Sequence, residues 1–362
     1  MIKDLTIGRL LKLREQLSFV IGKLLFDKTT ANYQPSSTIN SVLFIRGDGK
    51  LGDSIVSSFV YREMKACKPS LNIGVLCTPN SEHIFNNDPF IDNVHCYPKR
   101  AKIWKVNSLI RQLPNYDAVV FLTEVLKPRD FLMLRCLNAK AVVGLLPNIG
   151  LINVNIQKLV HGKHSQDYFV ESARALGFEL SDLSYRFNLP DKVEQEILHF
   201  LGDRKGHYIA LNPAGNTTKR TFTAKRLREV AYALRDRFNE LPLVILASPA
   251  NQQLVNEISA DIDGVFCFCE TKSFEQNAAL IKHCKALVSV DTATVHLANV
   301  YNKPLLAIYR QDPDNYKKWS PNYSKAITLF TRAAVNEYEE VNIGEFELAK
   351  FLDEVTILLN KA

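Results

Sequence analysis

The sequence of 362 residues predicts an α/β protein with two doubly wound parallel sheets in tandem. From residue 41 onward, short and nearly continuous apolar runs alternate with helical segments, the pattern of a parallel sheet covered on both faces. The alternation stops at residues 188–191 (Asn-Leu-Pro-Asp) and then restarts. The chain is also too long for one ordinary domain and suits two. We therefore expect a first domain over residues 41–188 and a second over 189–362, preceded by a helix and linker over 1–40.

Residues 2–28 carry apolar side chains at helical spacing and are predicted to form one amphipathic helix. Six basic and three acidic residues make this helix mildly cationic. Two interpretations remain open: the helix docks on the body of the protein or on a second subunit, or it lies on an anionic membrane surface. We favour docking, since the apolar stripe is broad and contains no Trp. Residues 29–40 are polar, include Pro35, and are typical of a linker.

Each domain contains five predicted strands with helices between them. In the first domain the strands are expected at 42–46, 72–77, 93–97, 117–122 and 141–145, and the helices near 54–67, 80–86, 103–112 and 166–176. In the second domain the strands are expected at 207–211, 243–247, 265–269, 286–290 and 305–309, and the helices near 223–237, 250–260, 273–284 and 293–301. A last helix, over about 345–360, could pack on either domain. Ligands bind such sheets at the carboxyl ends of the strands.

The composition is that of a globular protein with a sizeable core. Apolar residues make up 46% and charged residues 23%, which excludes disordered, collagen-like and disulfide-rich miniprotein classes. Seven cysteines, without a CxxC pair or zinc-finger spacing, are expected to be buried free thiols in a reducing cytosol. The sequence has neither the pattern of a signal peptide nor an apolar run of about 18 residues. We therefore expect a cytosolic protein that is at most peripheral to a membrane.

Basic charge is concentrated in the first half of the chain. Residues 1–188 hold 24 basic and 16 acidic residues, whereas residues 189–362 hold 21 and 22. This asymmetry predicts that the first half meets nucleic acid, a membrane surface or an acidic substrate. No nucleic-acid-binding motif occurs. A candidate contact follows the third predicted strand, although a solvated charged surface is the commoner explanation of one basic run. It consists of Lys99, Arg100, Lys102 and Lys105, with Trp104 among them.

The turn after the first strand, residues 47–52 (GDGKLG), matches the GxGxxG pattern of dinucleotide-binding folds. That fold also needs an acidic residue at the end of the second strand, and none occurs there before Glu82. Asp48 and Asp53 would moreover oppose a pyrophosphate. A nicotinamide or flavin site is therefore a minority interpretation. Asp53 itself has two evenly balanced explanations, an N-cap of the following helix or a general base at the end of a strand.

Two loops of the second domain could bind an anion. Residues 287–298 (LVSVDTATVHLA) run from a strand into a helix, whose first N–H groups and threonine hydroxyls could bind a diphosphate. Ordinary capping by Asp291 and Thr292 is the alternative, and a lone His296 is more often structural than catalytic. Residues 212–220 (NPAGNTTKR) form a small-residue loop ending in two cations, which could neutralise a phosphate or lie in solvent.

The order of these motifs is more specific than any of them alone. A strand with Gly52-Asp53 at a helix start, an NPAG loop ending in basic residues, and a strand followed by DTxxxHLA and Lys303-Pro304 occur in succession. Over approximately residues 41–322 the sequence therefore resembles glycosyltransferase family 9, the lipopolysaccharide heptosyltransferases. Further matches are at 164–168 (HSQDY), 312–313 (DP) and 319–321 (WSP).

This resemblance implies a GT-B fold, with two Rossmann-like doubly wound domains facing a central cleft. The first domain would bind the acceptor and the second the sugar nucleotide. The implied reaction is an inverting, metal-independent transfer of heptose from ADP-heptose to the inner core of lipopolysaccharide or lipooligosaccharide, with no cofactor. Such an enzyme would work at the cytoplasmic face of a bacterial inner membrane, as a peripheral protein. Residues 1–40 lie outside the resemblance, and oligomerisation through the N-terminal helix is an expectation from its apolar pattern alone.

The resemblance also implies roles for individual residues. Asp53 matches the base that takes the acceptor proton, and Lys219 or Arg220 matches the cation that offsets the leaving phosphate. The basic cluster around Trp104 would meet the anionic acceptor. The residues expected to hold the donor are Asp291, Thr292, Ala293, Thr294, His296, Asn212 and Gly215.

The sequence departs from the family pattern at three places. Ala293 replaces the glycine of the usual DTG, Phe222-Thr223 replaces the usual Trp-Pro, and Gln252 or Gln253 replaces the acid expected at the donor ribose. These departures bear on the sugar and nucleotide rather than on the fold. Two alternatives remain: a family 9 transferase acting on another glycan or on a protein, and a catalytically silent sugar-nucleotide-binding subunit.

Overall fold

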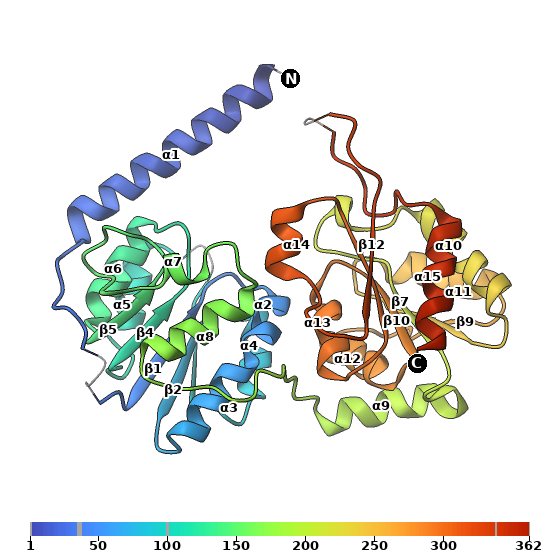
Figure 1. The fold of residues 1–362 in the computed structure, drawn as a ribbon, viewed down its shortest axis with the longest axis horizontal. Coiled ribbons are helices and arrows are strands. Elements are labelled where there is room, and N and C mark those ends of the chain that lie inside the picture. The colour runs from blue at the N-terminus through green and yellow to red at the C-terminus, as the bar shows by residue number, and fades with distance from the viewer. Residues whose placement is uncertain (1, 35–37, 99–100, 337–338, 362) are drawn as a thin grey trace. The chain divides into compact units, whose positions relative to one another are not determined.

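The computed structural model describes residues 2–34, 38–98, 101–336 and 339–361, with only the backbone described for residues 2–12. The chain divides into two compact units, Met1–Leu183 and Ser184–Ala362 (Figure 1). The division lies at 183/184 rather than at 188/189. Tyr185 already belongs to the second unit, because it is buried there with its ring 6.2 Å from that of His296.

The first unit is a six-stranded parallel sheet with the strand order β3-β2-β1-β4-β5-β6. The chain adds β2 and β3 on one side of β1 and then β4, β5 and β6 on the other side, as in doubly wound folds. Its elements are α1 (Ile2–Phe26), β1 (Ser41–Arg46), α2 (Leu51–Val56), α3 (Ser58–Cys67), β2 (Asn72–Cys77), α4 (Pro79–Asn86), β3 (Asn93–Cys96), α5 (Ile103–Ile110), β4 (Ala118–Phe121), α6 (Pro128–Leu137), β5 (Ala141–Gly144), β6 (Val154–Asn155), α7 (Gln157–Val160) and α8 (Ser165–Ala175).

The second unit repeats this topology, with the order β12-β11-β10-β7-β8-β9. The outer strand β12 and the strand β6 of the first unit were not expected from the sequence, since both are short or only partly buried. The elements are α9 (Asp191–Leu201), η1 (Gly202–Arg204), β7 (Ile209–Asn212), η2 (Thr218–Arg220), α10 (Ala224–Arg237), β8 (Leu243–Ile245), α11 (Gln252–Asp261), β9 (Val265–Cys267), α12 (Phe274–His283), β10 (Ala286–Val290), α13 (Ala293–Val300), β11 (Leu305–Tyr309), α14 (Pro313–Trp319), β12 (Ala326–Phe330) and α15 (Leu348–Asn360).

Each unit has its own core, formed where helices cover the apolar strands. In the first unit Leu43 of β1 and Phe131 of α6 belong to one buried cluster. In the second unit Phe351 and Val355 of α15 are buried with Val288 of β10. The last helix therefore packs on the second unit, a question that the sequence left open.

The helix expected over about 54–67 is broken into two. α2 ends at Val56 and α3 begins at Ser58. The hydroxyl of Ser57 donates to the carbonyl oxygen of Ser54 at 3.0 Å, and that of Ser58 donates to Ile55 at 2.7 Å. Serine hydroxyls that bond back to the preceding turn compete with regular helical hydrogen bonds, which accounts for the break.

Helices α6 and α14 were not expected either. Each has a proline in its first turn. The Asp130 carboxylate accepts the backbone N–H of Lys127 at 2.9 Å, and the Asp312 carboxylate accepts that of Asn315 at 3.0 Å. Proline and aspartate are helix-start signals that apolar periodicity does not register.

Candidate functional site

Three of the sequence-predicted residues follow strands at equivalent places in the two sheets. The strand order reverses between β1 and β4 in the first unit and between β7 and β10 in the second. Crevices at such switch points, beyond the carboxyl ends of the strands, are where doubly wound sheets bind ligands. The chain leaves the sheets at these points after β1, β7 and β10. The segments that follow carry Asp53 in α2, Arg220 in η2 and Asp291 directly after β10.

The glycines of the GxGxxG turn serve close packing. A side chain at Gly47 would collide with the hydroxyl of Tyr97, and one at Gly49 would place its Cβ 2.5 Å from Oγ1 of Thr78. Gly49 also has a φ of +64°, which favours glycine. The turn therefore lies directly against the ends of β2 and β3, and this packing explains the glycines.

Asp53 is the third residue of α2, and the N-cap of that helix is Lys50. The N-cap interpretation of Asp53 is therefore wrong, because the helix begins earlier than the sequence suggested. The Asp53 carboxyl is instead hydrogen-bonded to the carboxyl of Asp48 in the preceding turn. Two carboxyl groups in contact share a proton more readily than both ionise.

The positive charge of Arg46 favours ionisation of Asp48, the carboxyl group of the pair that lies closer to it. Its buried guanidinium lies 3.9 Å from Oδ2 of Asp48 and 4.9 Å from the ring centre of Phe169. Burial alone would raise the pKa of Asp48, but the charge of Arg46 and the hydrogen bond from Asp53 lower it. Burial, the negative charge of Asp48 and the hydrogen bond to it raise the pKa of Asp53 to about 7. Asp53 can therefore accept or release a proton near neutral pH.

In the second unit, Asn212 holds the two candidate loops together. This residue ends β7, and its buried Nδ2 lies 3.1 Å from the hydroxyl of Ser289, 3.1 Å from that of Thr292 and 2.9 Å from that of Thr294. A single amide thus fixes the end of β10 and the start of α13. The sequence suggested only a loop residue at this position. The three contacts of Asn212 form because β7 and β10 are neighbouring strands in the folded sheet.

The side chain of Thr292, the N-cap of α13, makes no capping hydrogen bond to the helix. Its hydroxyl lies 2.8 Å from that of Thr294. The first N–H groups of an α-helix have no acceptor within the helix, and with the helix dipole they can bind an anion. The alternative interpretation, capping by the Thr292 side chain, is therefore wrong for this residue, and the anion site at the start of α13 stays a prediction.

Asp291 lies in a polar cluster with Arg220 and Asn315. Nη1 of Arg220 is 3.2 Å from Oδ2 of Asp291, and Nδ2 of Asn315 donates to the same oxygen at 3.1 Å. Arg220 also donates to Oδ1 of Asn315 at 3.4 Å. Asn315 was not predicted from the sequence, although the Asp-Pro helix start after β11 is the signal that indicates its position.

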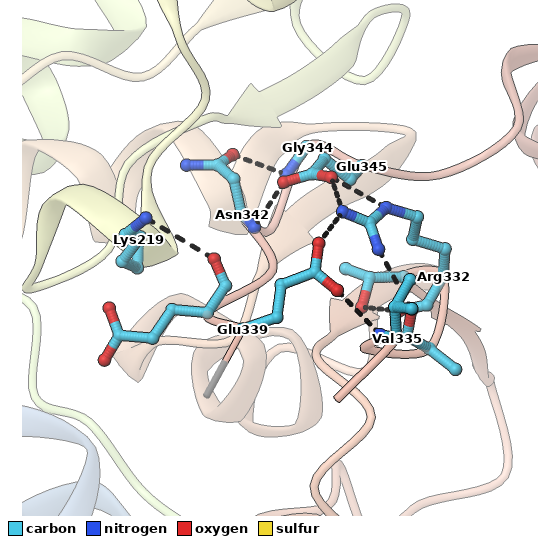
Figure 2. A network of polar contacts seen from close by, with 10 residues as sticks. Lys219, Arg332, Val335, Glu339, Asn342, Gly344 and Glu345 are labelled. Atoms are coloured by element: carbon cyan, nitrogen blue, oxygen red, sulfur yellow. Dashed lines mark hydrogen bonds and ion pairs between the residues drawn. The ribbon is translucent and has the colours of Figure 1, made fainter. Parts of the chain in front are cut away.

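Lys219 lies apart from this cluster. Its Nζ donates to the backbone carbonyl oxygen of Glu340 at 3.4 Å (Figure 2). Near Glu340, the guanidinium of Arg332 forms ion pairs with Glu339 and Glu345. Of the two cations at the end of the NPAG loop, only Arg220 is paired with Asp291 in the described structure.

Gly215 allows that loop to fold back on Arg220. A Cβ at this position would lie 2.5 Å from the carbonyl oxygen of Arg220 and 2.6 Å from its Cβ. The N–H of Gly215 donates to the hydroxyl of Thr221 at 3.2 Å. Glycine here therefore allows the loop to lie directly against the backbone of Arg220.

His296 is buried inside α13 among aromatic rings. Its ring centre lies 6.2 Å from that of Tyr185 and 6.5 Å from that of Trp319. These are edge contacts of the kind that aromatic side chains make in protein cores. The environment favours the structural interpretation of this histidine over the catalytic one.

Only part of the basic cluster can be placed, because Lys99 and Arg100 lie outside the described residues. Lys102 is the N-cap of α5, and its Nζ lies 4.9 Å from the ring centre of Trp104. Trp104 is 61% exposed, and Lys105 is exposed beside it. An exposed tryptophan between cations is a surface suited to binding an anionic or amphipathic partner.

Gln252 makes amide contacts at the position where an acid was expected. Its Nε2 donates to Oδ1 of Asn256 at 2.8 Å and to the carbonyl oxygen of Phe268 at 3.4 Å. Gln253 donates to Glu257 at 3.2 Å. An amide at Gln252 can still donate and accept hydrogen bonds, but it carries no charge.

Among the described residues, no group of three or more His, Cys, Asp or Glu side chains could hold a metal ion. None of the described helices is both long and apolar enough to cross a bilayer. The cysteines are free thiols, and the expectation that they are buried is wrong for Cys67, Cys136 and Cys269, which are exposed.

A family model described as glycosyltransferase family 9 (heptosyltransferase) matches residues 106–344. The chain is 25% identical over 333 residues to putative lipopolysaccharide heptosyltransferase 4 of Escherichia coli (strain K12), covering 86% of each chain. It is also 25% identical over 297 residues to lipopolysaccharide heptosyltransferase 3 of the same strain, covering 75% of this chain and 83% of the relative.

Solved structures share the fold. A family 9 glycosyl transferase from Veillonella parvula has a TM-score of 0.69 at 16% identity, covering 93% of this chain and 100% of its own. The E. coli ADP-heptose lps heptosyltransferase II has 0.67 at 18%, covering 89% and 99%. The E. coli heptosyltransferase WaaC with ADP has 0.67 at 14%, covering 88% and 99%. The expected GT-B class, with two Rossmann-like doubly wound domains, is thereby confirmed.

Proposed function

Because the chain belongs to glycosyltransferase family 9, the heptosyltransferase family, we propose that it transfers heptose from ADP-heptose to the inner core of lipopolysaccharide or lipooligosaccharide. The proposed transfer inverts the configuration of the sugar and uses no metal ion. Support for the donor and acceptor comes from the names of its relatives, two lipopolysaccharide heptosyltransferases and solved heptosyltransferases with ADP-type ligands.

The observation that carries the proposed mechanism is the Asp48–Asp53 pair. Asp53 stands at the carboxyl end of β1 with a pKa of about 7, so its ionised form can take a proton from an acceptor hydroxyl at neutral pH. The acceptor oxygen then attacks the anomeric carbon, the bond from that carbon to the diphosphate oxygen breaks, and ADP leaves with the electron pair. One direct displacement inverts the sugar, so no nucleophilic side chain is needed.

The leaving diphosphate gains negative charge as its bond to the sugar breaks. In this proposal the N–H groups at the start of α13, at Thr292, Ala293 and Thr294, bind the diphosphate, and Arg220 offsets its charge. Asp291, fixed by Arg220 and Asn315, accepts hydrogen bonds from donor sugar hydroxyls. Backbone N–H groups and a guanidinium supply the stabilisation that a metal ion gives in other transferases.

Asn212, Gly215 and His296 act through the loops that they position. Asn212 binds the hydroxyls around the start of α13, Gly215 lets the loop carrying Arg220 close, and His296 packs inside α13. Lys219 contributes long-range positive charge from its place beside Glu340.

The acceptor is proposed to meet the first unit through Lys102, Trp104 and Lys105, together with Lys99 and Arg100. Phosphate and acidic sugar groups would pair with the cations, and sugar rings would stack on the exposed indole. Since lipopolysaccharide is anchored in lipid, the enzyme is proposed to work as a peripheral protein on the cytoplasmic face of the bacterial inner membrane.

A donor-and-acceptor screen tests the proposal. Nucleotide sugars are first compared by thermal shift of the full chain, and those that stabilise it are then assayed for transfer to truncated lipopolysaccharides, other glycans and proteins. We expect stabilisation by ADP-heptose and transfer only to lipopolysaccharide cores, with turnover undiminished by a chelator. Transfer to another acceptor would change the substrate class, and donor binding without any turnover would indicate a silent subunit.

A further inference from the structure

The N-terminal helix α1 has one face docked on the first unit. The ring of Phe19 lies 5.6 Å from that of Phe131, and Gly22 is buried so close to α6 that a Cβ would lie 2.9 Å from Cα of Pro128. Asp27, just after the helix, accepts the N–H groups of Gly150 and Leu151 at 3.0 Å each. The carboxyl-terminal part of α1 is therefore fixed on the body of the protein.

The opposite face of α1 is apolar and exposed. Leu13, Leu17, Val20 and Leu24 follow one another at intervals of four and three residues, which places them in one stripe along the helix. Leu17 is 55% exposed and Leu24 80% exposed. We call these four residues the α1 stripe. Contiguous exposed apolar side chains on a folded protein mark a surface that meets a partner.

Positive charge lies at the end of the α1 stripe. A shallow groove of about 450 Å³ is lined by Val20 and Leu24 of the stripe and by Lys23 and Lys28, with Asp27 and Thr29. Nζ of Lys23 donates to the carbonyl oxygen of Asn148 at 2.7 Å, and Nζ of Lys28 donates to Oδ1 of Asn138 at 2.8 Å. Both oxygens are uncharged, so these contacts leave the positive charges of the two lysines in place.

These features together fit a lipid surface that carries negative charge. We propose that the α1 stripe inserts into the interface of an anionic phospholipid bilayer, with lipid phosphates held by Lys23 and Lys28 in the groove at its end. An amphipathic helix with an apolar stripe flanked by lysines lies in the plane of a membrane in this way. This inference rests on the proposed peripheral location and names α1 as the segment that contacts the membrane. It can be tested by a binding assay that does not need enzyme activity.

A second copy of the chain fits the α1 stripe less well. Residues 2–28 hold six basic and three acidic residues, so two such helices packed together would bring like net charges close. An anionic bilayer instead complements that charge. The two interpretations of α1 from the sequence are thus not exclusive, because one face of the helix docks on α6 and the other remains for a membrane.

Vesicle flotation of the full chain tests the inference. The vesicles contain phosphatidylcholine alone or phosphatidylcholine with phosphatidylglycerol, and the wild-type protein is expected to float mainly with the anionic ones. The double variant Leu17→Gln/Leu24→Gln should lose roughly tenfold in partitioning. Lys23→Gln/Lys28→Gln should lose the preference for anionic vesicles. Ile357→Gln, at an exposed apolar position of α15, is the matched control and should float as wild type.

Three outcomes would overturn the inference: no flotation of the wild type, flotation of the Leu17/Leu24 variant at the wild-type level, or a wild-type dimer in solution that this variant abolishes. Circular dichroism and thermal melting verify that each variant is folded. If the wild-type protein does not float but is still stabilised by the donor, only the membrane inference is contradicted. If it floats but no nucleotide sugar stabilises it, only the proposed transferase function is contradicted.

Discussion

The guanidinium of Arg220 lies 3.2 Å from the carboxylate of Asp291, joining the loop after β7 to the loop after β10. Asn315 contacts both side chains, so the three residues form one polar cluster at the carboxyl edge of the second sheet. Lys219, the residue directly before Arg220, instead donates to the backbone carbonyl oxygen of Glu340 (Figure 2). Adjacent cations of the same charge thus have different surroundings, which makes them a matched pair for mutagenesis.

We predict that Arg220→Gln lowers kcat for heptosyl transfer by roughly 100-fold, equivalent to about 3 kcal/mol, because the charge developing on the leaving diphosphate loses its cation. Lys219→Gln should change kcat by about threefold or less. Steady-state kinetics with ADP-heptose measure both. Equal losses in the two variants, or a larger loss at Lys219, would contradict the assignment of Arg220.

The pH profile tests the pairing of Asp48 with Asp53. Since Asp53 must be ionised to act as a base, kcat/KM should rise with pH through a midpoint near 7. In Asp48→Asn the neighbouring negative charge is gone, so the pKa of Asp53 falls and the midpoint should move about one unit toward acid. An unmoved midpoint would mean that burial alone sets the pKa. Wild-type donor stabilisation in the thermal-shift assay verifies that the variant is folded and still binds the donor.

The raised pKa of Asp53 should also make the free energy of unfolding fall as the pH rises, whereas kcat/KM rises. The pKa of Asp53 is raised on folding from an ordinary 3.8 to about 7, so the folded state keeps its proton over that interval. This contribution to the free energy of unfolding is complete below about pH 4 and is lost as the pH rises through 7. The asparagine of Asp53→Asn cannot ionise, so this variant should gain about 3–4 kcal/mol relative to wild type between pH 4 and pH 8, the equivalent of a pKa change of about three units. Chemical denaturation at both pH values measures the difference, and a constant difference would argue against the raised pKa.

Gly215→Ala should weaken the donor site without unfolding the protein. The added methyl group would meet the backbone of Arg220 at 2.5 Å, so the loop must shift and carry the guanidinium away from Asp291. We expect a loss of roughly tenfold in kcat/KM for the donor and a nearly unchanged melting temperature. Asn216→Ala, at the exposed neighbouring position, is the control and should retain wild-type kinetics. Wild-type kinetics in Gly215→Ala would show that the close approach to Arg220 is not needed.

The sequence by itself determined the fold class and most of its elements. Apolar strand segments alternating with helices require a parallel sheet with both faces covered, because only such a sheet buries continuous apolar strands. It also placed Asp53, Asp291 and Arg220 after strands, and hence at the carboxyl edges of the sheets. The order of the motifs was enough to identify the family to which the chain belongs.

Only the tertiary structure decided which of these residues act on each other. The strand order brings Asn212 beside the start of α13, and α14 brings Asn315 to Asp291, although the members of each pair are far apart in the chain. The turn after β1 sets Asp48 against Asp53, and the packing of α1 on α6 decides which face of that helix stays exposed. Hydrogen bonds and pKa values depend on distance and burial, and these are properties of the packed chain that residue order alone does not contain.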